Sequence, residues 1–409
     1  MLKTVASSYR YRWVVLLVCW LAYIVAFMQR LSIGPLAPFL KEDLNLTSAQ
    51  AGFFMSAAAF GYMIALMPAG WLVDKIGVRW ILLIGEVVGG IFIASMFTVT
   101  TFTQGLVLMA LAGLGMGCIM PVTTKAILEW FLPKERATAM GLKQTAVNVG
   151  GIITAVTLPT VALALGWHYG FLGIGVIAVV IGFVSFALYK QPPQSIVSDT
   201  SEPVISSGAR PSVWEVFKSR DIWLLMSAGV SLVIVEFSAI AYFVLYLEED
   251  LLFSVVTAGF FLAVLEGGGV FGKPITGLVS DRLFSGNRKP VLLLMFGLTF
   301  VMCVAFAFLG QDSPSWVILL LSLVLGFVAI GWGGLQLTLI GEFAGKELAG
   351  TVTGASGALI MIGVMVGPPV FGYIVDTTGS YQIAWYFLAG MAILATVLLS
   401  FVREGRKRI

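Results

Sequence analysis

Long apolar runs separated by short polar turns make up almost the entire chain. A helix needs about 20 apolar residues to cross the hydrocarbon core of a bilayer, and the runs reach or exceed this length. The pattern therefore predicts an all-α membrane protein. Twelve transmembrane helices are expected, over residues 13–38, 49–73, 79–100, 103–130, 137–165, 168–189, 221–247, 254–280, 289–310, 315–341, 348–375 and 380–402.

The longest polar break begins with Gln-Pro-Pro-Gln and is rich in Ser, Thr and Pro. This composition is typical of a flexible linker. Six predicted helices precede the break and six follow it. We therefore expect an N-terminal six-helix bundle over residues 1–190, a cytoplasmic linker over 191–220 and a C-terminal six-helix bundle over 221–409.

A charged turn occurs once in each half of the chain. The first copy reads Gly-Trp-Leu-Val-Asp-Lys-Ile-Gly-Val-Arg over residues 70–79, and the second begins Gly-Leu-Val-Ser-Asp-Arg over residues 277–282. A motif repeated at the same place in each half predicts a chain built from two copies of one unit. One constant offset of 207 positions relates Gly70 to Gly277, Asp74 to Asp281 and Lys75 to Arg282.

The composition agrees with a membrane protein and excludes several other classes. Hydrophobic residues make up 59% of the chain and charged residues 11%, whereas soluble domains carry about 25% charged residues. The net charge of +3 is too small to indicate a nucleic-acid partner. The three cysteines lie in separate apolar runs, with no spacing that predicts a disulfide framework or a metal site. We expect no cofactor and no enzymatic activity.

The basic residues predict the orientation, because cytoplasmic loops of membrane proteins are enriched in Lys and Arg. With both termini in the cytoplasm, 20 of the 24 basic residues lie in inside segments or at the adjoining helix ends, and only Lys41 lies outside. Lys143 belongs to the inside group in this count, although it lies about two turns into the fifth helix. The predicted outside turns carry acids: Glu42, Asp43, Glu248, Glu249, Asp250, Asp312 and Asp376.

The remaining three cations, Arg30, Lys125 and Lys273, fall inside predicted helices. An unpaired charge at the bilayer centre costs about 2.5–3.5 kcal/mol, so such a residue needs a partner or a water-filled cavity. Three cations placed in this way indicate a path for anions.

The twelve helices, the central linker and the repeated Gly-x-x-x-Asp-(Lys/Arg) turn resemble the major facilitator superfamily of transporters. The resemblance covers the whole chain. It implies two pseudo-symmetric six-helix bundles around a central cavity that opens to alternate sides of the membrane. It also implies gating roles for the charged residues of the two turns, which are Asp74, Lys75, Arg79, Asp281 and Arg282.

Within that superfamily the chain is similar to the anion:cation symporters, which carry sugar acids and related organic anions. Many of these carriers have Asp-Arg where this chain has Gln29-Arg30. The other matching places are Tyr62, nine residues before Trp71; Lys125, five residues before Trp130; and the loop over residues 130–137.

Arg30 is the first predicted substrate-binding residue, because its planar guanidinium suits bidentate capture of a carboxylate. The family pattern implies that Lys125 assists it, with an i,i+4 pair to Glu129 as the alternative. Lys273 is also a candidate, although it lies close enough to the inner end of its helix to reach the interface instead. Four neutral side chains complete the site, with hydrogen bonds between helices as their alternative role: Tyr62, Gln144, Asn148 and Gln336.

Two acids in mid-helix positions, Glu236 and Glu266, are the predicted proton-coupling residues. Burial raises the pKa of a carboxyl group and a nearby cation lowers it, so a carboxyl group balanced between these effects suits proton transfer. A permanent ion pair with one of the three intramembrane cations is the alternative.

The sequence therefore predicts a secondary active transporter of a small organic anion, such as a monocarboxylate or a sugar acid, that works by proton symport and alternating access. We expect a monomer that spans a cell membrane many times, in a bacterial inner membrane, with H⁺ as the coupling ion and Na⁺ left open. Two alternatives remain: a nitrate/nitrite-type carrier, and a membrane sensor that transports nothing.

Overall fold

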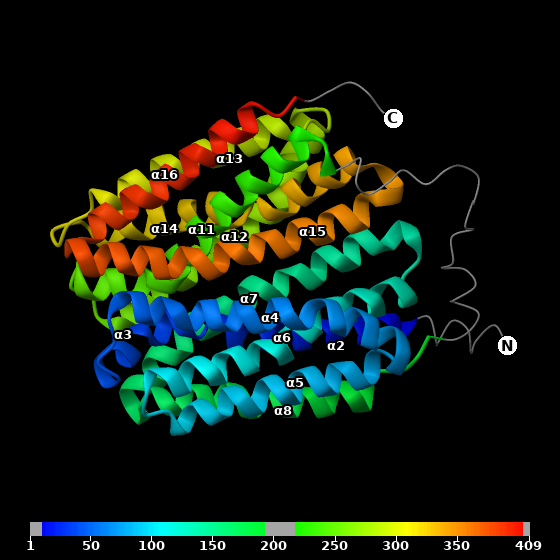
Figure 1. Cartoon of the computed structure of the whole chain (residues 1–409), viewed down its shortest axis with the longest axis horizontal. Helices are drawn as coiled ribbons and strands as arrows, with labels where there is room; N and C mark the ends of the chain where they lie inside the picture. The colour runs from blue at the N-terminus through cyan, green and yellow to red at the C-terminus, as the bar shows by residue number, and fades with distance from the viewer. Residues whose placement is uncertain (1–9, 193–216, 404–409) are drawn as a thin grey trace. The chain divides into compact units, whose positions relative to one another are not determined.

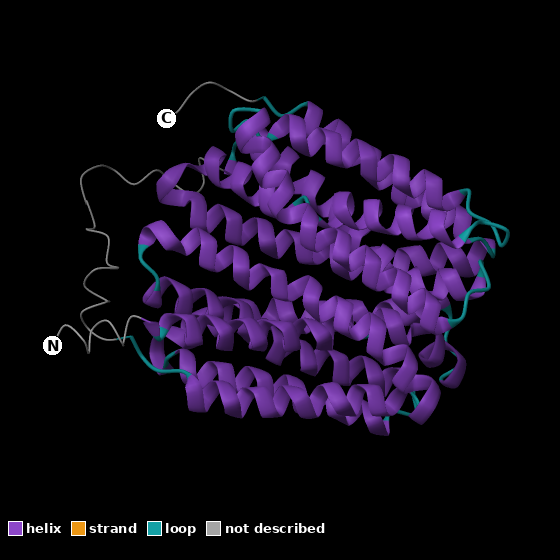
Figure 2. Ribbon diagram, turned by 180° about the vertical axis from the view of Figure 1, so that it is seen from behind, coloured by secondary structure: helices purple, strands orange, loops and turns teal. Residues whose placement is uncertain are grey.

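The computed structural model describes residues 10–192 and 217–403, which form helices joined by short loops and contain no strand (Figure 1, Figure 2). The helices of the first half are α2 (Arg12–Leu31), α3 (Ile33–Asp43), α4 (Ser48–Ile76), α5 (Val78–Ser95), the short 3-10 helix η1 (Met96–Thr98), α6 (Phe102–Trp130), α7 (Pro133–Leu165) and α8 (Trp167–Leu188). Those of the second half are α11 (Arg220–Glu249), α12 (Val255–Leu283), α13 (Lys289–Ala307), α14 (Ser315–Ile330), α15 (Gly333–Thr378) and α16 (Tyr381–Ser400).

Twelve segments of these helices are long and apolar enough to cross a membrane. Most of them begin and end within a few residues of the predicted bounds; the second, for example, covers Ser48–Ile76 against a prediction of 49–73. The predicted all-α fold with twelve transmembrane helices is therefore confirmed.

The first predicted helix is interrupted at Ser32, where α2 ends and α3 begins. Pro35 explains the break, because it has no backbone N–H to donate to the carbonyl of Leu31. The Ser32 hydroxyl donates a hydrogen bond of 2.8 Å to the carbonyl of Gln29 at this point. The break comes one residue after Arg30, since Leu31 is the last residue of α2.

The tenth and eleventh predicted helices are joined in the structure. The tenth breaks instead at Gly331 and Trp332, and α15 then continues without interruption to Thr378, through residues 342–347, where we predicted a turn. This short stretch contains no proline, so nothing in it removes a backbone donor from the helical ladder.

The described residues form two compact units. Residues 10–36 and 57–192 make up unit 1, and residues 37–56 and 217–403 make up unit 2. Segment 37–56, which we predicted to be part of the N-terminal bundle, clusters with unit 2. The predicted linker lies almost entirely outside the described residues, so the expected boundaries at 190 and 220 stay a prediction.

Helix pairs repeat inside the two units. In unit 1, α2 packs on α7 and α5 packs on α8; in unit 2, α11 packs on α15 and α13 packs on α16. In the order of the spanning segments, these are the first with the fifth and the third with the sixth of each half. The packing thus has the two-fold repeat that the charged turns predicted.

Two glycines show the same repeat at atomic scale. Gly61 of α4 and Gly268 of α12 lie 207 positions apart. A Cβ atom at Gly61 would overlap the carbonyl of Ala110 in α6, and one at Gly268 would overlap the carbonyl of Leu323 in α14. Glycine lets the paired backbones touch, as small residues do where membrane helices pack.

Candidate functional site

Arg30 lies at the end of α2, in the interior of unit 1, and is 3% exposed. Its guanidinium carbon lies 5.2 Å from the ring centre of Tyr62 in α4 and 5.9 Å from that of Phe27 in its own helix. Both distances are in the range of cation–π interactions. The Tyr62 hydroxyl is directed to the sulfur of Met120 at 3.3 Å. The structure therefore brings together Arg30 and Tyr62, as the prediction of a shared site requires.

Gln29, the neighbour of Arg30, points toward α5 and is also buried. Its carbonyl oxygen Oε1 lies 2.7 Å from the position that a Cβ atom would take on Gly89. No described residue donates a hydrogen bond to this oxygen. A buried amide carbonyl without a donor is uncommon and marks a polar spot inside the bundle.

Lys125 lies near the end of α6, and its ammonium group contacts acids. It forms an ion pair of 2.6 Å with Asp74 at the end of α4, and a longer one of 3.7 Å with Glu129 in its own helix. Its Nζ also donates to the carbonyl of Val73 at 3.3 Å. A predicted substrate-binding residue and a predicted gating residue thus meet in one cluster, and the i,i+4 pair that we weighed as the alternative is present.

Lys143 of α7 is a buried cation that sequence reasoning missed. It is 2% exposed, and its Nζ lies 4.6 Å from the ring centre of Tyr23 in α2. The same Nζ donates a hydrogen bond of 3.2 Å to the hydroxyl of Thr124 in α6. We counted Lys143 with the cytoplasmic group, although its depth of about two turns already indicated an interior position.

The two polar neutral candidates of α7 differ in their surroundings. Asn148 is fully buried, whereas Gln144 is only partly buried. The Gln144 carbonyl oxygen Oε1 accepts no hydrogen bond from the described residues. Asn148 therefore belongs to the interior of unit 1, and Gln144, although only partly buried as a residue, also has a buried amide oxygen.

A second group of charges lies in unit 2. Glu266 and Lys273 are seven residues apart on α12, which puts them about two turns apart on one face. Glu236 lies on α11, and the charges of both carboxyl groups act on Lys273. The structure thus places both predicted proton-coupling acids within electrostatic range of one lysine, which is one of the partners that the sequence offered for them.

Gln336 of α15 is buried at 1% exposure and links two helices. Its amide nitrogen Nε2 donates a hydrogen bond of 2.5 Å to the carbonyl of Leu225 in α11. This is the interhelical role that we gave as the alternative to substrate contact.

The predicted gating residues form separate contacts. The Arg79 Nε donates to the carbonyl of Phe186 at 2.6 Å, and the Lys75 ammonium lies 3.7 Å from the ring centre of Trp71. In unit 2, Asp281 forms a short ion pair with Arg288, which also contacts Glu342 at 3.4 Å, while Arg282 is exposed.

Asp376, an acid of unit 2, caps the start of α4, and sequence reasoning missed this role. The Asp376 carboxylate accepts hydrogen bonds of 2.7 and 2.8 Å from the backbone N–H groups of Ser48 and Ala49, at the start of α4. Anions are stabilised at helix N-termini. The Tyr242 hydroxyl donates to the carbonyl of Ser48 at 2.5 Å. The only sequence signal was that Asp376 lies in a predicted outside turn.

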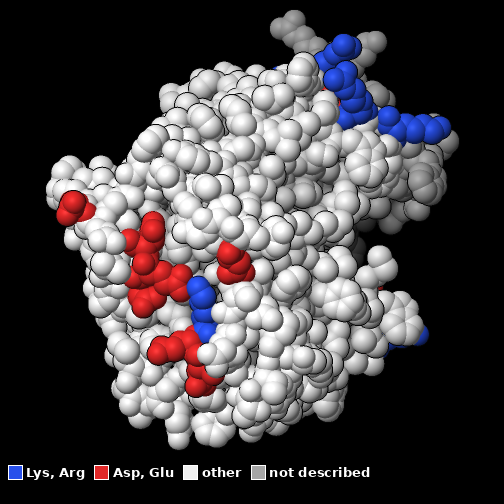
Figure 3. Space-filling view, turned by 60° about the vertical axis from the view of Figure 1, so that its left-hand side comes forward, with Lys and Arg blue, Asp and Glu red and all other residues white. Residues whose placement is uncertain are grey.

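Acidic side chains gather on one face of the molecule (Figure 3). In unit 2, Glu42, Glu248 and Glu249 line one pocket together with Lys41. Lys41 and Glu249 form an ion pair of 2.7 Å, and the Tyr381 hydroxyl donates to the same carboxylate at 2.7 Å. Burial and the adjacent Glu249 charge raise the pKa of Asp250. These acids belong to the turns that we expected on the outside, and the side of the membrane that they face stays a prediction.

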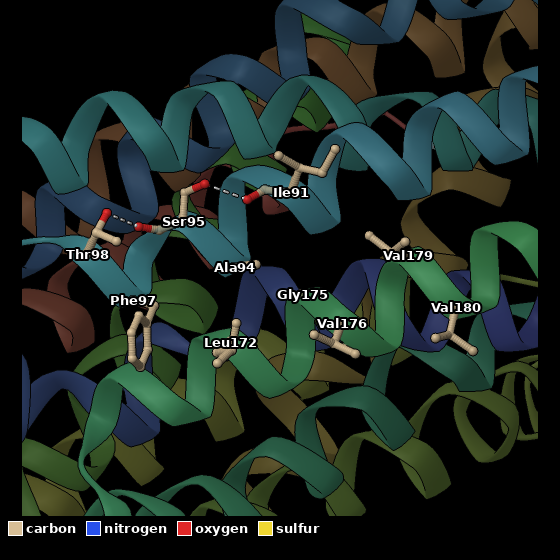
Figure 4. Close-up of a pocket in the computed structure, with 10 residues that line it drawn as sticks. All are labelled: Ile91, Ala94, Ser95, Phe97, Thr98, Leu172, Gly175, Val176, Val179 and Val180. Carbon is tan, nitrogen blue, oxygen red and sulfur yellow. Dashed lines mark hydrogen bonds between the residues drawn. The ribbon is translucent and has the colours of Figure 1, made fainter.

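A surface groove between α5 and α8 has a volume of about 410 Å³ (Figure 4). Its lining includes Ile91, Leu172 and Val176, and no charged residue. Ile91 and Val176 are each about half exposed, as expected for side chains that face lipid. The groove therefore does not suit an anion. The described residues also hold no cluster of His, Cys, Asp and Glu that could bind a metal ion.

Buried charges inside apolar helices, in two units with the same helix pairs, define a polytopic membrane protein with a polar interior, as in transporters. The chain belongs to the Major Facilitator Superfamily, whose sequence pattern matches residues 19–363. It is a multi-pass membrane protein of a transporter family and not an enzyme.

Two relatives match the chain over nearly its full length. It is 24% identical over 400 residues to the hexuronate transporter of Bacillus subtilis, with 95% of this chain and 94% of the relative covered. It is 28% identical over 415 residues to the probable sulfoacetate transporter of Cupriavidus necator, again with 95% and 94% covered. The predicted similarity to the organic-anion and sugar-acid group is confirmed.

A solved structure shows the same fold. A bacterial homologue of the human lysosomal transporter Spinster superposes with a TM-score of 0.80 at 17% sequence identity, over 96% of this chain and 97% of that chain. At this level of identity the likeness concerns the fold alone.

Proposed function

We propose that this chain is a secondary active transporter that carries a small organic anion together with a proton, by alternating access. The observation that carries the proposal is the guanidinium of Arg30, buried at 3% exposure in a transporter fold. A cation inside a membrane protein marks a substrate or ion pathway. The two relatives named as transporters of hexuronate and of sulfoacetate support an organic anion as the substrate class.

In unit 1, Arg30 would bind the substrate carboxylate through its planar fork of N–H donors. The Tyr62 ring lies beside the guanidinium, and among the described residues its hydroxyl is hydrogen-bonded only to a weak acceptor, the sulfur of Met120. This hydroxyl can therefore turn to donate to the substrate. We assign Lys125 to the gate with Asp74, because its ammonium is engaged there.

In unit 2, Glu236 and Glu266 would share the coupling proton beside Lys273. The lysine charge favours the ionised carboxylates, and burial favours the protonated ones. Glu266 is 1% exposed, so the two effects compete strongly at its position. Such a balance suits a group that binds and releases a proton in each transport cycle.

The anion-binding part is tested by uptake of glucuronate and of sulfoacetate into vesicles that contain the purified protein. Arg30→Ala should abolish uptake while the variant keeps its thermal midpoint within a few degrees, and Arg30→Lys should restore part of it. Lys190 offers a control, because it is exposed and its ammonium lies 4.7 Å from the centre of the Tyr11 ring. Lys190→Gln therefore removes one positive charge at a place away from Arg30. Undiminished uptake by Arg30→Ala would contradict the assignment of Arg30 to the anion site.

The coupling part is tested with the same vesicles. Dissipating the pH gradient with a proton ionophore should stop accumulation. Glu266→Gln or Glu236→Gln should also stop accumulation but leave exchange of labelled for unlabelled substrate intact, because exchange needs no net proton movement. Accumulation that persists without any proton gradient contradicts proton symport. A sensor, in contrast, would bind the anion and show neither uptake nor exchange.

A further inference from the structure

We propose that Lys143 is a second cation of the anion site in unit 1 and that the substrate therefore carries two separated acidic groups. This inference rests on the proposed function and narrows its substrate class from an organic anion to a dianion. Arg30 would hold one acidic group and Lys143 the other.

The surroundings of Lys143 contain too little negative charge for a buried ammonium group. An ammonium group has three N–H donors. Within the described chain, one of them is bonded to the Thr124 hydroxyl, the Tyr23 ring lies at 4.6 Å, and no carboxylate forms an ion pair with it. A buried charge is stable only when it is paired or hydrogen-bonded. An acidic group of the substrate would supply the missing charge.

A continuous row of side chains leads from Lys143 to Arg30. The Tyr23 and Phe27 rings lie 5.0 Å apart, centre to centre, and the Arg30 guanidinium carbon lies 5.9 Å from the Phe27 ring. Tyr23, Phe27 and Arg30 follow one another at intervals of four and three residues, so they share one face of α2. The two cations therefore lie along the same face, separated by two aromatic rings.

Helix α6 supports both ends of this row. Met120 contacts the Tyr62 hydroxyl beside Arg30, and Thr124 contacts Lys143. These two residues are one helical turn apart, so they project from the same side of α6. One face of α6 thus contacts both the Arg30 end and the Lys143 end of the row.

The two cations differ in the acidic group that each would hold. The guanidinium of Arg30 presents a planar fork that matches a carboxylate, whereas the ammonium of Lys143 is a compact point charge that accepts a carboxylate or a sulfonate. A chain with an acidic group at each end fits both. The structure thus favours dicarboxylates, sugar diacids and sulfocarboxylates, whereas the sequence suggested a monocarboxylate or a sugar acid of either kind.

The experiment compares matched dianions and monoanions on the purified full chain by titration calorimetry and by uptake into vesicles. The pairs are glucarate with glucuronate, and sulfoacetate with acetate. The wild-type protein should bind the dianion of at least one pair about tenfold or more tightly. Lys143→Gln should weaken dianion binding about tenfold to a hundredfold and leave monoanion binding nearly unchanged, since one charge-assisted hydrogen bond is lost only with the dianion.

Lys143→Arg should keep the preference for the dianion, and Lys190→Gln should change the affinity for neither the dianion nor the monoanion. If Lys143→Gln does not fold, Lys143→Met fills the same space without a charge. Equal binding of both members of each pair by the wild type, or an unchanged preference in the uncharged variant, overturns the inference while organic-anion transport stands. If the wild type neither binds nor transports any of the four anions, the proposed function fails as well.

Discussion

At the scale of single residues, burial and contacts separate charges that look alike in the sequence. Lys125 and Lys143 both lie near the helix ends that we expect in the cytoplasm. The ammonium of Lys125 reaches Asp74 at 2.6 Å, whereas that of Lys143 is turned inward to an aromatic ring. Because a side chain as long as lysine can point in either direction, its position along the helix does not decide between interior and interface.

Glu86 of α5 is the second buried charge that position alone could not interpret. It is fully buried beside Gly182 of α8, and neither carboxyl oxygen has a hydrogen-bond partner among the described residues. We expect Glu86→Gln to keep or raise the thermal stability of the purified protein, because the amide fills the same space without an ionisable group. Glu86→Ala should lower the free energy of unfolding by about 2 kcal/mol through the cavity that it leaves.

Thermal midpoints of the two Glu86 variants, measured in one detergent, check this prediction. A larger loss of stability in Glu86→Gln than in Glu86→Ala would contradict it, because the carboxylate charge would then stabilise the fold.

At the scale of helices, close contacts explain where glycine is required. Gly61 and Gly70 both lie inside α4. A Cβ atom at Gly61 would overlap the carbonyl of Ala110 in α6, whereas one at Gly70 would meet no atom within 4 Å. The sequence shows two helical glycines, and only the packing of α4 against α6 distinguishes them.

The two glycines therefore make a matched pair for a stability test. Gly61→Ala should lower the free energy of unfolding by about 1–3 kcal/mol, the usual cost of overpacking. Gly70→Ala should leave it unchanged or raise it by up to about 1 kcal/mol, because alanine favours the helix. Thermal melts of both variants measure these changes in stability. Equal effects of the two substitutions would show that the contact of Gly61 with α6 is unimportant.

At the scale of the whole molecule, the predicted orientation places the charged turns of residues 70–79 and 277–282 in the cytoplasm and the acidic turns outside. The predicted orientation can be tested with single cysteines at Asn287 and Asp312, both exposed in their loops. Two of the three native cysteines, Cys19 and Cys303, are buried, and all three can be replaced beforehand.

In intact cells, a membrane-impermeant maleimide should label Asp312→Cys strongly and Asn287→Cys only after the membrane is opened. The reason is that Asn287 lies beside Arg288 in a basic turn, whereas Asp312 lies in an acidic one. The opposite labelling pattern would show that the predicted orientation is reversed. Each gate would then control transport in the opposite direction.

The sequence alone determined the twelve helices, the internal repeat and the presence of buried cations such as Arg30. These follow from hydrophobic length, from a motif at a fixed offset and from the cost of charge in lipid, all of which are local or additive properties of the chain. Tertiary structure alone decided the partners: Lys125 with Asp74, Lys143 with Tyr23, and Asp376 with the start of α4. Each pair joins residues that are far apart in sequence. The direction in which a long side chain points depends on the helices packed around it as well as on the helix that carries it.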